Sequence, residues 1–460
     1  MWRLLSICLL LAVPVLAQEK FPAPTRDDRI VVVAPHPDDE ILGAGGLIQA
    51  ALAVGADVRV VYLTNGDHNQ VAFKLYSLDL HLSAQQYLGF GEKRRQEALA
   101  GAAKLGVPAD HLTFLGYPDW GTLRIWRDYW NAPKPFRSDA TRVEAVPYPE
   151  AFCPGSPYRP QSVEADFVEL FRQFKPTMIF VTHPGDTAPD HRAAANFVRL
   201  AALDLEAEGL RPTVYYYVVH FGRWPRPYHY HPDLGLEPPT ALLDNGDWMS
   251  FPLSTNQTAR KHDAILENRT QVTTRQYFLV AFARTNELFA TIPLVSVPCL
   301  PEDAPLDWRK AVRNKALTVA VPDASDLHAP AEEWISIQTT DFLRQGNDLI
   351  ALVDFKNRLG KRTGVYLSLF GYQRGVAFEK LPKVEIHIGP LGGLKVYASD
   401  KRVAQPGVTV TSVANRFFVR VPLRLLGGAR LDHVFTCTRA HLGEIAMDDT
   451  AWQLFDLEKG

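Results

Sequence analysis

Cysteine is scarce in this chain, with four residues among 460. Cys8 lies close to the N-terminus, which leaves Cys153, Cys299 and Cys437 for the rest of the chain. Because three is an odd number, at least one of these thiols has no partner within the chain. Their spacing matches no zinc-finger pattern, so the sequence argues against a cysteine-based metal module and supports no particular disulfide.

An excess of one charge sign is also missing, since 49 basic residues face 51 acidic ones and the formal charge is −2. Proteins that bind nucleic acid or an anionic membrane electrostatically carry a basic patch or stripe, and none is visible here. We therefore expect no nucleic-acid partner. Beyond the N-terminus no apolar run is long enough for a transmembrane helix, so we expect no transmembrane segment in the mature chain.

The N-terminus has the pattern of a secretory signal peptide. Arg3 supplies the positive charge, residues 4–15 form the apolar segment, and Val15-Leu16-Ala17 is a small-residue cleavage site before Gln18. No cysteine follows that site, so a lipoprotein anchor is not indicated. We expect residues 1–17 to be a signal peptide and the protein to be exported, either to the periplasm or out of the cell.

A β-branched run at residues 30–33 ends in a cluster of acid/base and metal-binding groups: Pro35-His36-Pro37-Asp38-Asp39-Glu40. The run predicts a buried strand of a parallel sheet, and the apolar residues that follow suit a helix packed on that sheet. Open α/β sheets bind ligands at the carboxyl ends of their strands. A histidine and two carboxylates at this point can supply ligands to zinc and leave one carboxylate for proton transfer.

A second cluster has the same context. Residues 178–181 read as another buried strand, and the polar segment from Thr182 to Arg192 leads into an apolar helix pattern that begins near Ala193. His191 therefore also lies at a junction between a strand and a helix. Two such junctions on one parallel sheet can converge in space, although His36 and His191 are far apart in the sequence.

Together these motifs resemble those of the LmbE-like (PIG-L) family of zinc-dependent de-N-acetylases. The resemblance rests on the Pro-His-Pro-Asp-Asp-Glu run and the later Pro189-Asp190-His191, with weaker landmarks around Asp67, Arg94 and Asp119, and it covers roughly residues 28–300. It implies a Rossmann-like fold and removal of acetyl groups from N-acetylglucosamine-type substrates.

The resemblance also implies roles for individual residues. His36, Asp39 and His191 would be the zinc ligands, with iron(II) as another metal that suits them. Asp38 would be the acid/base, Asp190 would orient His191 from the second shell, and Arg94 and Asp119 would contact the substrate.

One position departs from the family pattern. The family often has histidine where this chain has Ala188, and that histidine is a candidate donor to the oxyanion. Either zinc alone stabilises the oxyanion or another donor replaces this histidine. His183, His68 and His220 are the candidates, and we include His183 among the expected catalytic residues. Two alternatives stay open: a zinc amidase or esterase that acts on another acyl group, or a non-catalytic glycan-binding protein.

The pattern of elements predicts more than one domain. Strand and helix signals alternate up to about residue 300, which indicates an α/β domain (residues 18–300) with a mostly parallel sheet and helices on both faces. Residues 301–330 are rich in proline, alanine and aspartate and read as a linker. From residue 331 to 460, short strands separated by Gly, Pro and Asp predict an antiparallel β-sandwich. Contact with glycan and a purely structural or oligomerising role stay open for it.

A long connection at residues 118–160 carries many aromatic residues and prolines. Two interpretations remain open for it, a lid that faces the substrate or a loop packed on its own small core. Gly43-Ala44-Gly45-Gly46 lacks the third spaced glycine of a dinucleotide fingerprint. These small residues more simply allow a helix to pack closely against the sheet.

Overall fold

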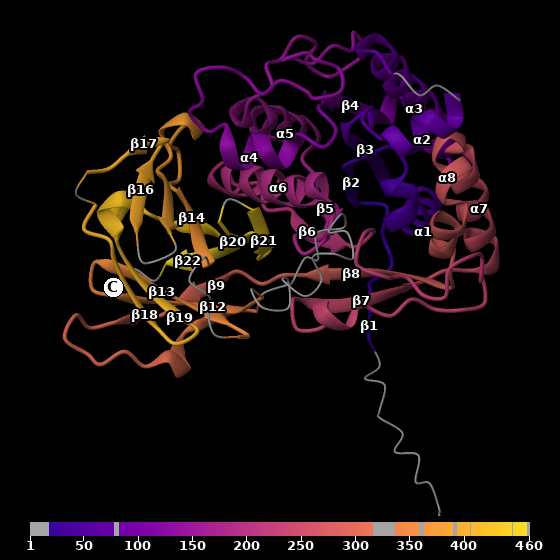
Figure 1. Ribbon diagram of the computed structural model, residues 1–460. Helices are drawn as coiled ribbons and strands as arrows, with labels where there is room; N and C mark the ends of the chain where they lie inside the picture. The colour runs from indigo at the N-terminus through magenta and orange to yellow at the C-terminus, as the bar shows by residue number, and fades with distance from the viewer. Residues whose placement is uncertain are drawn as a thin grey trace, which may run out of the picture.

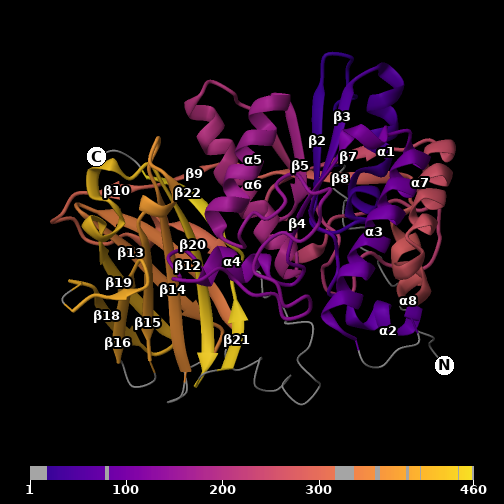
Figure 2. The ribbon, with the colours of Figure 1, turned by 90° about the horizontal axis from the view of Figure 1, so that it is seen from above.

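The computed structural model describes residues 18–77, 82–315, 336–357, 363–389, 393–404, 406–443 and 445–457. The expected signal peptide and residues 316–330 of the expected linker lie outside these ranges. Figures 1 and 2 show a helix-covered sheet on one side of the molecule and a strand-rich part on the other. No helix of the described residues combines the length and apolarity needed to cross a bilayer.

The first sheet is mostly parallel, as the sequence predicts. Its strand order is β1-β7-β8-β6-β5-β2-β3-β4, and the five strands from β6 to β4 in that order are parallel to one another. Strands β7 and β8 pair antiparallel at the other side. The bounds are β1 Glu19–Lys20, β2 Arg29–Ala34, β3 Asp57–Thr64, β4 Leu112–Tyr117, β5 Met178–Thr182, β6 Thr213–Tyr217, β7 Asp247–Pro252 and β8 Asn286–Thr291.

Helices cover both faces of this sheet (Figure 2). Alternate side chains of β2 enter two different cores: Val31 and Val33 pack with α5 and α6, while Ile30 and Val32 pack with α1, α3 and α7. The helices are α1 Asp39–Val54, α2 Gln70–Ser77, α3 Ala84–Leu105, α4 Thr122–Asp128, α5 Pro160–Phe174, α6 Pro189–Ala207, α7 Thr255–Glu267 and α8 Arg269–Leu279. The α/β fold class with a mostly parallel sheet is therefore confirmed.

The C-terminal part contains two further sheets, antiparallel in most of their pairings. One has the order β10-β12-β13-β19-β18 and the other β17-β16-β15-β14-β20-β22-β9. Side chains from both sheets form one apolar cluster, as in a sandwich. The long strands are β12 Ile337–Gln345, β13 Asp348–Phe355, β14 Thr363–Tyr372, β15 Lys383–Ile388, β16 Leu394–Ala398, β18 Thr409–Val413, β19 Arg416–Pro422, β20 His433–Leu442, β21 Ile445–Asp449 and β22 Gln453–Leu457, with a short β17 at Lys401–Arg402.

The C-terminal sheets take in residues that precede the expected boundary at 331. Strand β9 (Val295–Val297) pairs with β22, while β10 (Cys299–Leu300) and β11 (Val312–Lys315) both pair with β12. Part of the expected linker is thus a strand. The composition of residues 301–330 concealed this because β11 is only four residues long, too short for a clear strand pattern.

The aromatic connection at residues 118–160 is mostly core. Trp126, Trp130 and Phe136 are buried, and Trp126 packs edge-on against Phe197 and Trp452. The lid interpretation therefore fails for most of the segment, since these rings fill the space between the α/β layer and the C-terminal sheets. Trp120 is the exception, with 51% of its surface exposed.

Candidate metal centre

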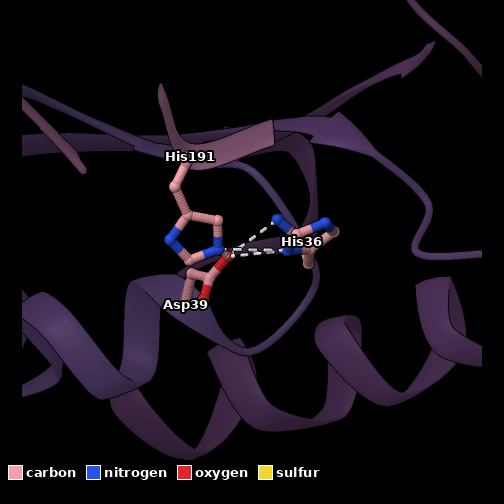
Figure 3. Close-up of side chains that lie close together, drawn as sticks. All are labelled: His36, Asp39 and His191. Atoms are coloured by element: carbon pink, nitrogen blue, oxygen red, sulfur yellow. Dashed lines mark hydrogen bonds and ion pairs between the residues drawn. The ribbon is translucent and has the colours of Figure 1, made fainter. Parts of the chain in front are cut away.

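Three side chains converge where β2 and β5 end (Figure 3). His36 comes from the turn after β2 and Asp39 is the first residue of α1, while His191 lies in the first turn of α6, which begins with Pro189. His36 Nδ1 lies 3.2 Å from His191 Nε2, and Asp39 Oδ2 lies 3.3 Å from His36 Nδ1 and 3.1 Å from His191 Nε2. The structure thus brings together the three residues that the sequence singled out.

These separations fit a tetrahedral metal ion. Ligand bonds of about 2.0–2.1 Å place neighbouring ligand atoms of a tetrahedral site about 3.3 Å apart. Two imidazole nitrogens and one carboxylate oxygen are also the donor types of catalytic zinc sites, which leave a fourth position open. That these residues bind a metal stays a prediction.

Carboxylates hold both imidazoles by their second nitrogen. His36 Nε2 lies 3.1 Å from Asp119 Oδ1 and 3.3 Å from Asp190 Oδ2, while His191 Nδ1 lies 3.1 Å from Asp186 Oδ2. Such carboxylates fix the tautomer that presents the other nitrogen to a metal. We expected Asp190 to orient His191, but Asp190 faces His36 instead, and Asp186 is the carboxylate that faces His191.

Asp186 was missed by the sequence reasoning, although it lies in the same strand-to-helix connection as His191. Its carboxylate also accepts hydrogen bonds from the backbone N–H groups of Ala188, Val219 and His220. A buried carboxylate with this many donors is strongly oriented. The position of Asp186 between Gly185 and Thr187 is a local signal for such a turn.

A second trio, His36 with Asp119 and Asp190, also groups its ligand atoms closely. Asp190 Oδ2, one oxygen of this trio, already accepts from the Trp120 N–H, whereas Asp119 Oδ1 faces His36 and the His68 N–H binds the other Asp119 oxygen. The trio with His191 offers the better metal site, since its three donor atoms point at one another.

The site stabilises positive charge. Burial alone would lower the pKa of His191, but Asp186 and Asp39 raise it to about 10. Burial would raise the pKa of Asp39, but the charge and hydrogen bond of His191, with those of His36, hold it well below its ordinary value. The carboxylates that stabilise protonated histidines here would also stabilise a bound metal cation, and metal binding would release the histidine protons.

Asp38 stands beside this trio in an unusual backbone conformation, with φ of 129°. Strain of this kind in a non-glycine residue is found mostly at functional sites. Burial raises the pKa of Asp38 to about 7, although Arg94 acts in the opposite direction. A carboxyl group that titrates near neutrality suits a general base.

The two expected substrate contacts lie deeper than expected. Arg94 is 3% exposed and donates to the carbonyls of Gly66 and Pro37, with its third contact at 3.3 Å from Asp38 Oδ2. Asp119 is also 3% exposed. Arg94 therefore ties the residue before Asp38 to the connection after β3, and direct contact of either Arg94 or Asp119 with a substrate stays a prediction.

His183, expected as a catalytic residue, faces away from the His36, Asp39 and His191 trio. Side chains alternate along a strand, and Thr182 turns toward His191, where its hydroxyl donates to the His191 carbonyl. His183 consequently points the other way, where it stacks on Trp248 and lies within 3.2 Å of the Asn245 carbonyl.

Of the other candidates for the missing donor, His220 lies nearest to the trio. Its ring is 5.0 Å from that of His191 and stacks on Phe278. His68 instead contacts Gln70 and Tyr87.

The fold and this geometry define an α/β protein with a candidate metal centre at the carboxyl edge of its parallel sheet. Residues 31–202 match the family described as GlcNAc-PI de-N-acetylase (PIG-L). This segment of the chain is therefore similar to the PIG-L family, as its motifs led us to expect.

Two relatives show the extent of the similarity. A 1D-myo-inositol 2-acetamido-2-deoxy-alpha-D-glucopyranoside deacetylase of Mycobacterium sp. (strain KMS) is 32% identical over 172 residues, which cover 35% of this chain and 46% of the relative. The protein of the same name from Tsukamurella paurometabola is 29% identical over 290 residues, covering 60% and 91%. The chain thus spans about half of the length of the first of these relatives.

Among solved structures, the N,N'-diacetylchitobiose deacetylase from Pyrococcus horikoshii is similar with 19% identity and a TM-score of 0.36. The similarity covers 58% of this chain and 84% of that one.

Proposed function

We propose that the protein is an exported, zinc-dependent hydrolase that removes the N-acetyl group from an N-acetylglucosamine-type sugar or glycoconjugate. The convergence of His36, Asp39 and His191, with Asp38 beside them, is the observation that carries the proposal. The match of residues 31–202 to the PIG-L family supports it, and the two relatives described above are named as deacetylases of a 2-acetamido-2-deoxyglucoside.

A zinc ion held by the trio would polarise the acetamide carbonyl and lower the pKa of a water at its open position. Iron(II) suits the same ligands. The remaining steps belong to the chain's own residues.

Asp38 would take the proton of the attacking water and later give it to the leaving amine. Its carboxyl group is still 12% exposed, so it can reach a substrate at the site. Arg94 would hold Asp38 in place, because its guanidinium binds the carbonyl of Pro37 and lies 3.3 Å from the Asp38 carboxylate.

His220 would supply the donor that Ala188 cannot. Burial and the charge of His191 lower its pKa to about 4, so the imidazole is neutral near pH 7 and keeps one N–H to donate. Within the described part of the chain, neither ring nitrogen of His220 has a hydrogen-bond partner that would compete with an oxyanion.

Trp120 is the best candidate for stacking on a sugar ring. Its indole is half exposed, while its backbone N–H donates to Asp190 at 2.6 Å, which ties it to the metal centre. Contact of the C-terminal sheets with a longer glycan stays a prediction, as does export by the signal peptide. N-terminal sequencing of secreted protein that starts at Gln18 would support export.

The test combines metal content with acetate release from a panel of N-acetylated sugars and glycans. We expect about one zinc per chain and release of acetate, and we expect His191→Ala to lose both together. His183→Gln is the matched control, because His183 is a buried histidine near the same connection that does not face the trio.

Full zinc content in His191→Ala would disprove the ligand assignment. Release of a different acyl group would favour the amidase or esterase alternative. Glycan binding without turnover of any substrate, in zinc-loaded protein, would favour the non-catalytic alternative.

A further inference from the structure

A cavity of about 320 Å³ lies between the α/β layer and the C-terminal sheets, on the side of α6 that faces β22. Its walls include Arg199 of α6, His183, Asn245, Ile292, Trp452 and Leu454. Small-molecule sites typically have volumes of roughly 300–1,000 Å³ with mainly apolar walls and a few polar groups. In Figure 1, α6 runs between the strands of the first sheet and the C-terminal strands.

Arg199 is the unusual group in this cavity. It is 7% exposed, and its one hydrogen bond to a described residue is a long contact of 3.4 Å to the Trp452 carbonyl. Among the residues that the structure describes, it forms no ion pair. Buried charges in proteins are normally paired, because an uncompensated one costs several kcal/mol.

Arg192 provides an internal comparison. It lies seven residues earlier on the same helix, faces the same C-terminal strands and is also buried. Its guanidinium binds the Asp449 carboxylate at 2.8 Å and the Thr450 carbonyl at 2.7 Å. Asp449 raises the pKa of Arg192 against the effect of burial, whereas burial lowers the pKa of Arg199. Arg192 thus has a counter-charge, whereas Arg199 faces a cavity.

We propose that this cavity binds a small organic monocarboxylate whose carboxylate pairs with Arg199 and whose apolar part lies against Ile292 and Leu454. A guanidinium presents paired donors that match a carboxylate. The second arginine at the cavity, Arg313, already lies 3.2 Å from Asp341, so it adds little net charge.

The charges at the cavity rim limit the ligand to one negative charge. Asp247 is exposed there and would repel a more highly charged anion. We therefore expect an apolar monocarboxylate such as butyrate to bind more tightly than acetate, and phosphate to bind least.

The site is linked to the metal centre through one short connection. Asn245 lines the cavity and lies within hydrogen-bond distance of His183, whose Nδ1 accepts from the Gly185 N–H, next to the Asp186 that orients His191. The proposal does not depend on the proposed hydrolase activity, since it concerns binding at a separate cavity.

The experiment measures binding of butyrate, acetate and phosphate to the full chain by calorimetry and by thermal shift. We expect saturable butyrate binding that raises the melting temperature. Arg199→Met should weaken it by roughly thirtyfold or more, the usual effect of removing one partner of a buried charge pair. Ligand-free Arg199→Met should melt higher than the wild type, because an uncompensated buried charge is gone.

Two matched variants locate the site. Arg211→Met removes an exposed arginine beyond the end of α6 and should bind butyrate like the wild type. Asp39→Asn disables the metal centre, where a carboxylate could also bind, and should retain butyrate binding. Arg199→Lys keeps the charge but not the paired donors and should bind with intermediate affinity.

Butyrate binding that survives in Arg199→Met, or that is lost in Asp39→Asn, would overturn the proposal. A wild type that shows no saturable binding to butyrate or acetate would also overturn it. In that case Arg199→Met should melt no higher than the wild type, which would mean that the chain itself supplies the counter-charge.

Discussion

At the scale of single residues, the site combines Asp38, whose backbone is strained, with His220, an imidazole that comes from a different position than the usual family histidine. Asp38 is held at positive φ beside the three clustered ligands, while Ala188 leaves the usual histidine position empty and His220 approaches His191 from the end of β6. The proposed function assigns proton transfer to Asp38 and oxyanion stabilisation to His220, and each role can be tested by one substitution.

Asp38→Asn should leave metal content unchanged and lower the turnover rate by about 10²–10⁴-fold, the usual weight of general acid–base catalysis. Asparagine has nearly the same shape but accepts no proton. Steady-state acetate release together with metal analysis checks this. A variant within a few-fold of the parent would show that another group is the base.

His220→Phe should lower turnover by about 10²–10³-fold, the typical cost of one oxyanion donor, while the KM changes less. Phenylalanine preserves the stacking on Phe278 and removes the N–H. Ala188→His should then rescue the variant in part but add little to the wild type. A large gain from Ala188→His in the wild type would mean that His220 is no substitute donor.

At the scale of elements, helix α1 is joined to its surroundings by a buried ion pair. Lys261 of α7 donates to the Leu42 carbonyl and to Glu287, and Glu287 of β8 accepts from the N–H groups of Gly46 and Leu47. Both charged side chains are essentially without exposure. The pair thus fixes α1, whose N-terminus carries Asp39, against α7 and β8.

The glycines of α1 allow this close approach. A Cβ added at Gly43 would lie 2.1 Å from the Tyr217 ring, and one at Gly46 would lie 2.1 Å from Leu253. Contacts this short are impossible without displacement of the neighbours. The packing interpretation of these small residues is therefore confirmed.

Glu287→Gln should lower the free energy of unfolding by about 3–5 kcal/mol, because it leaves the buried charge of Lys261 unpaired. Denaturant unfolding measures the effect. Glu208→Gln is the control: it breaks the exposed pair with Arg172 and should cost no more than about 1 kcal/mol. Equal losses of unfolding free energy in the two variants would show that the buried pair stabilises the fold no more than an exposed pair does.

At the scale of the whole molecule, the α/β layer and the C-terminal sheets share one apolar core. Trp126 of α4 packs against Phe370 of β14, Phe435 of β20 and Trp452, and the same cluster continues into α5, α6 and the first sheet. Arg192, next to His191, binds Asp449 of β21. The C-terminal strands therefore help to position the helix that carries a candidate ligand.

Deletion of the chain after residue 326 should consequently give a protein that aggregates or melts well below the full chain. It would expose Trp126, Trp130 and Phe197 and remove the counter-charge of Arg192. Solubility and thermal melting of the truncated and full-length proteins measure this. A truncated protein that stays folded, monomeric and zinc-loaded would show that the shared core is dispensable.

The sequence by itself determined the α/β character, the strand-to-helix junctions and the trio of His36, Asp39 and His191. These depend on local periodicity and on a short motif, and parallel strands bring their carboxyl ends to one edge whatever the rest of the fold does. Only the tertiary structure decided which carboxylate faces which imidazole, that His183 points away, and that Lys261 pairs with Glu287. It also decided that the aromatic connection is core and that Arg199 lacks the partner that Arg192 has. Such pairings depend on which faces of distant elements meet, and the repeat of a strand or a helix sets the direction of a side chain without setting what lies opposite it.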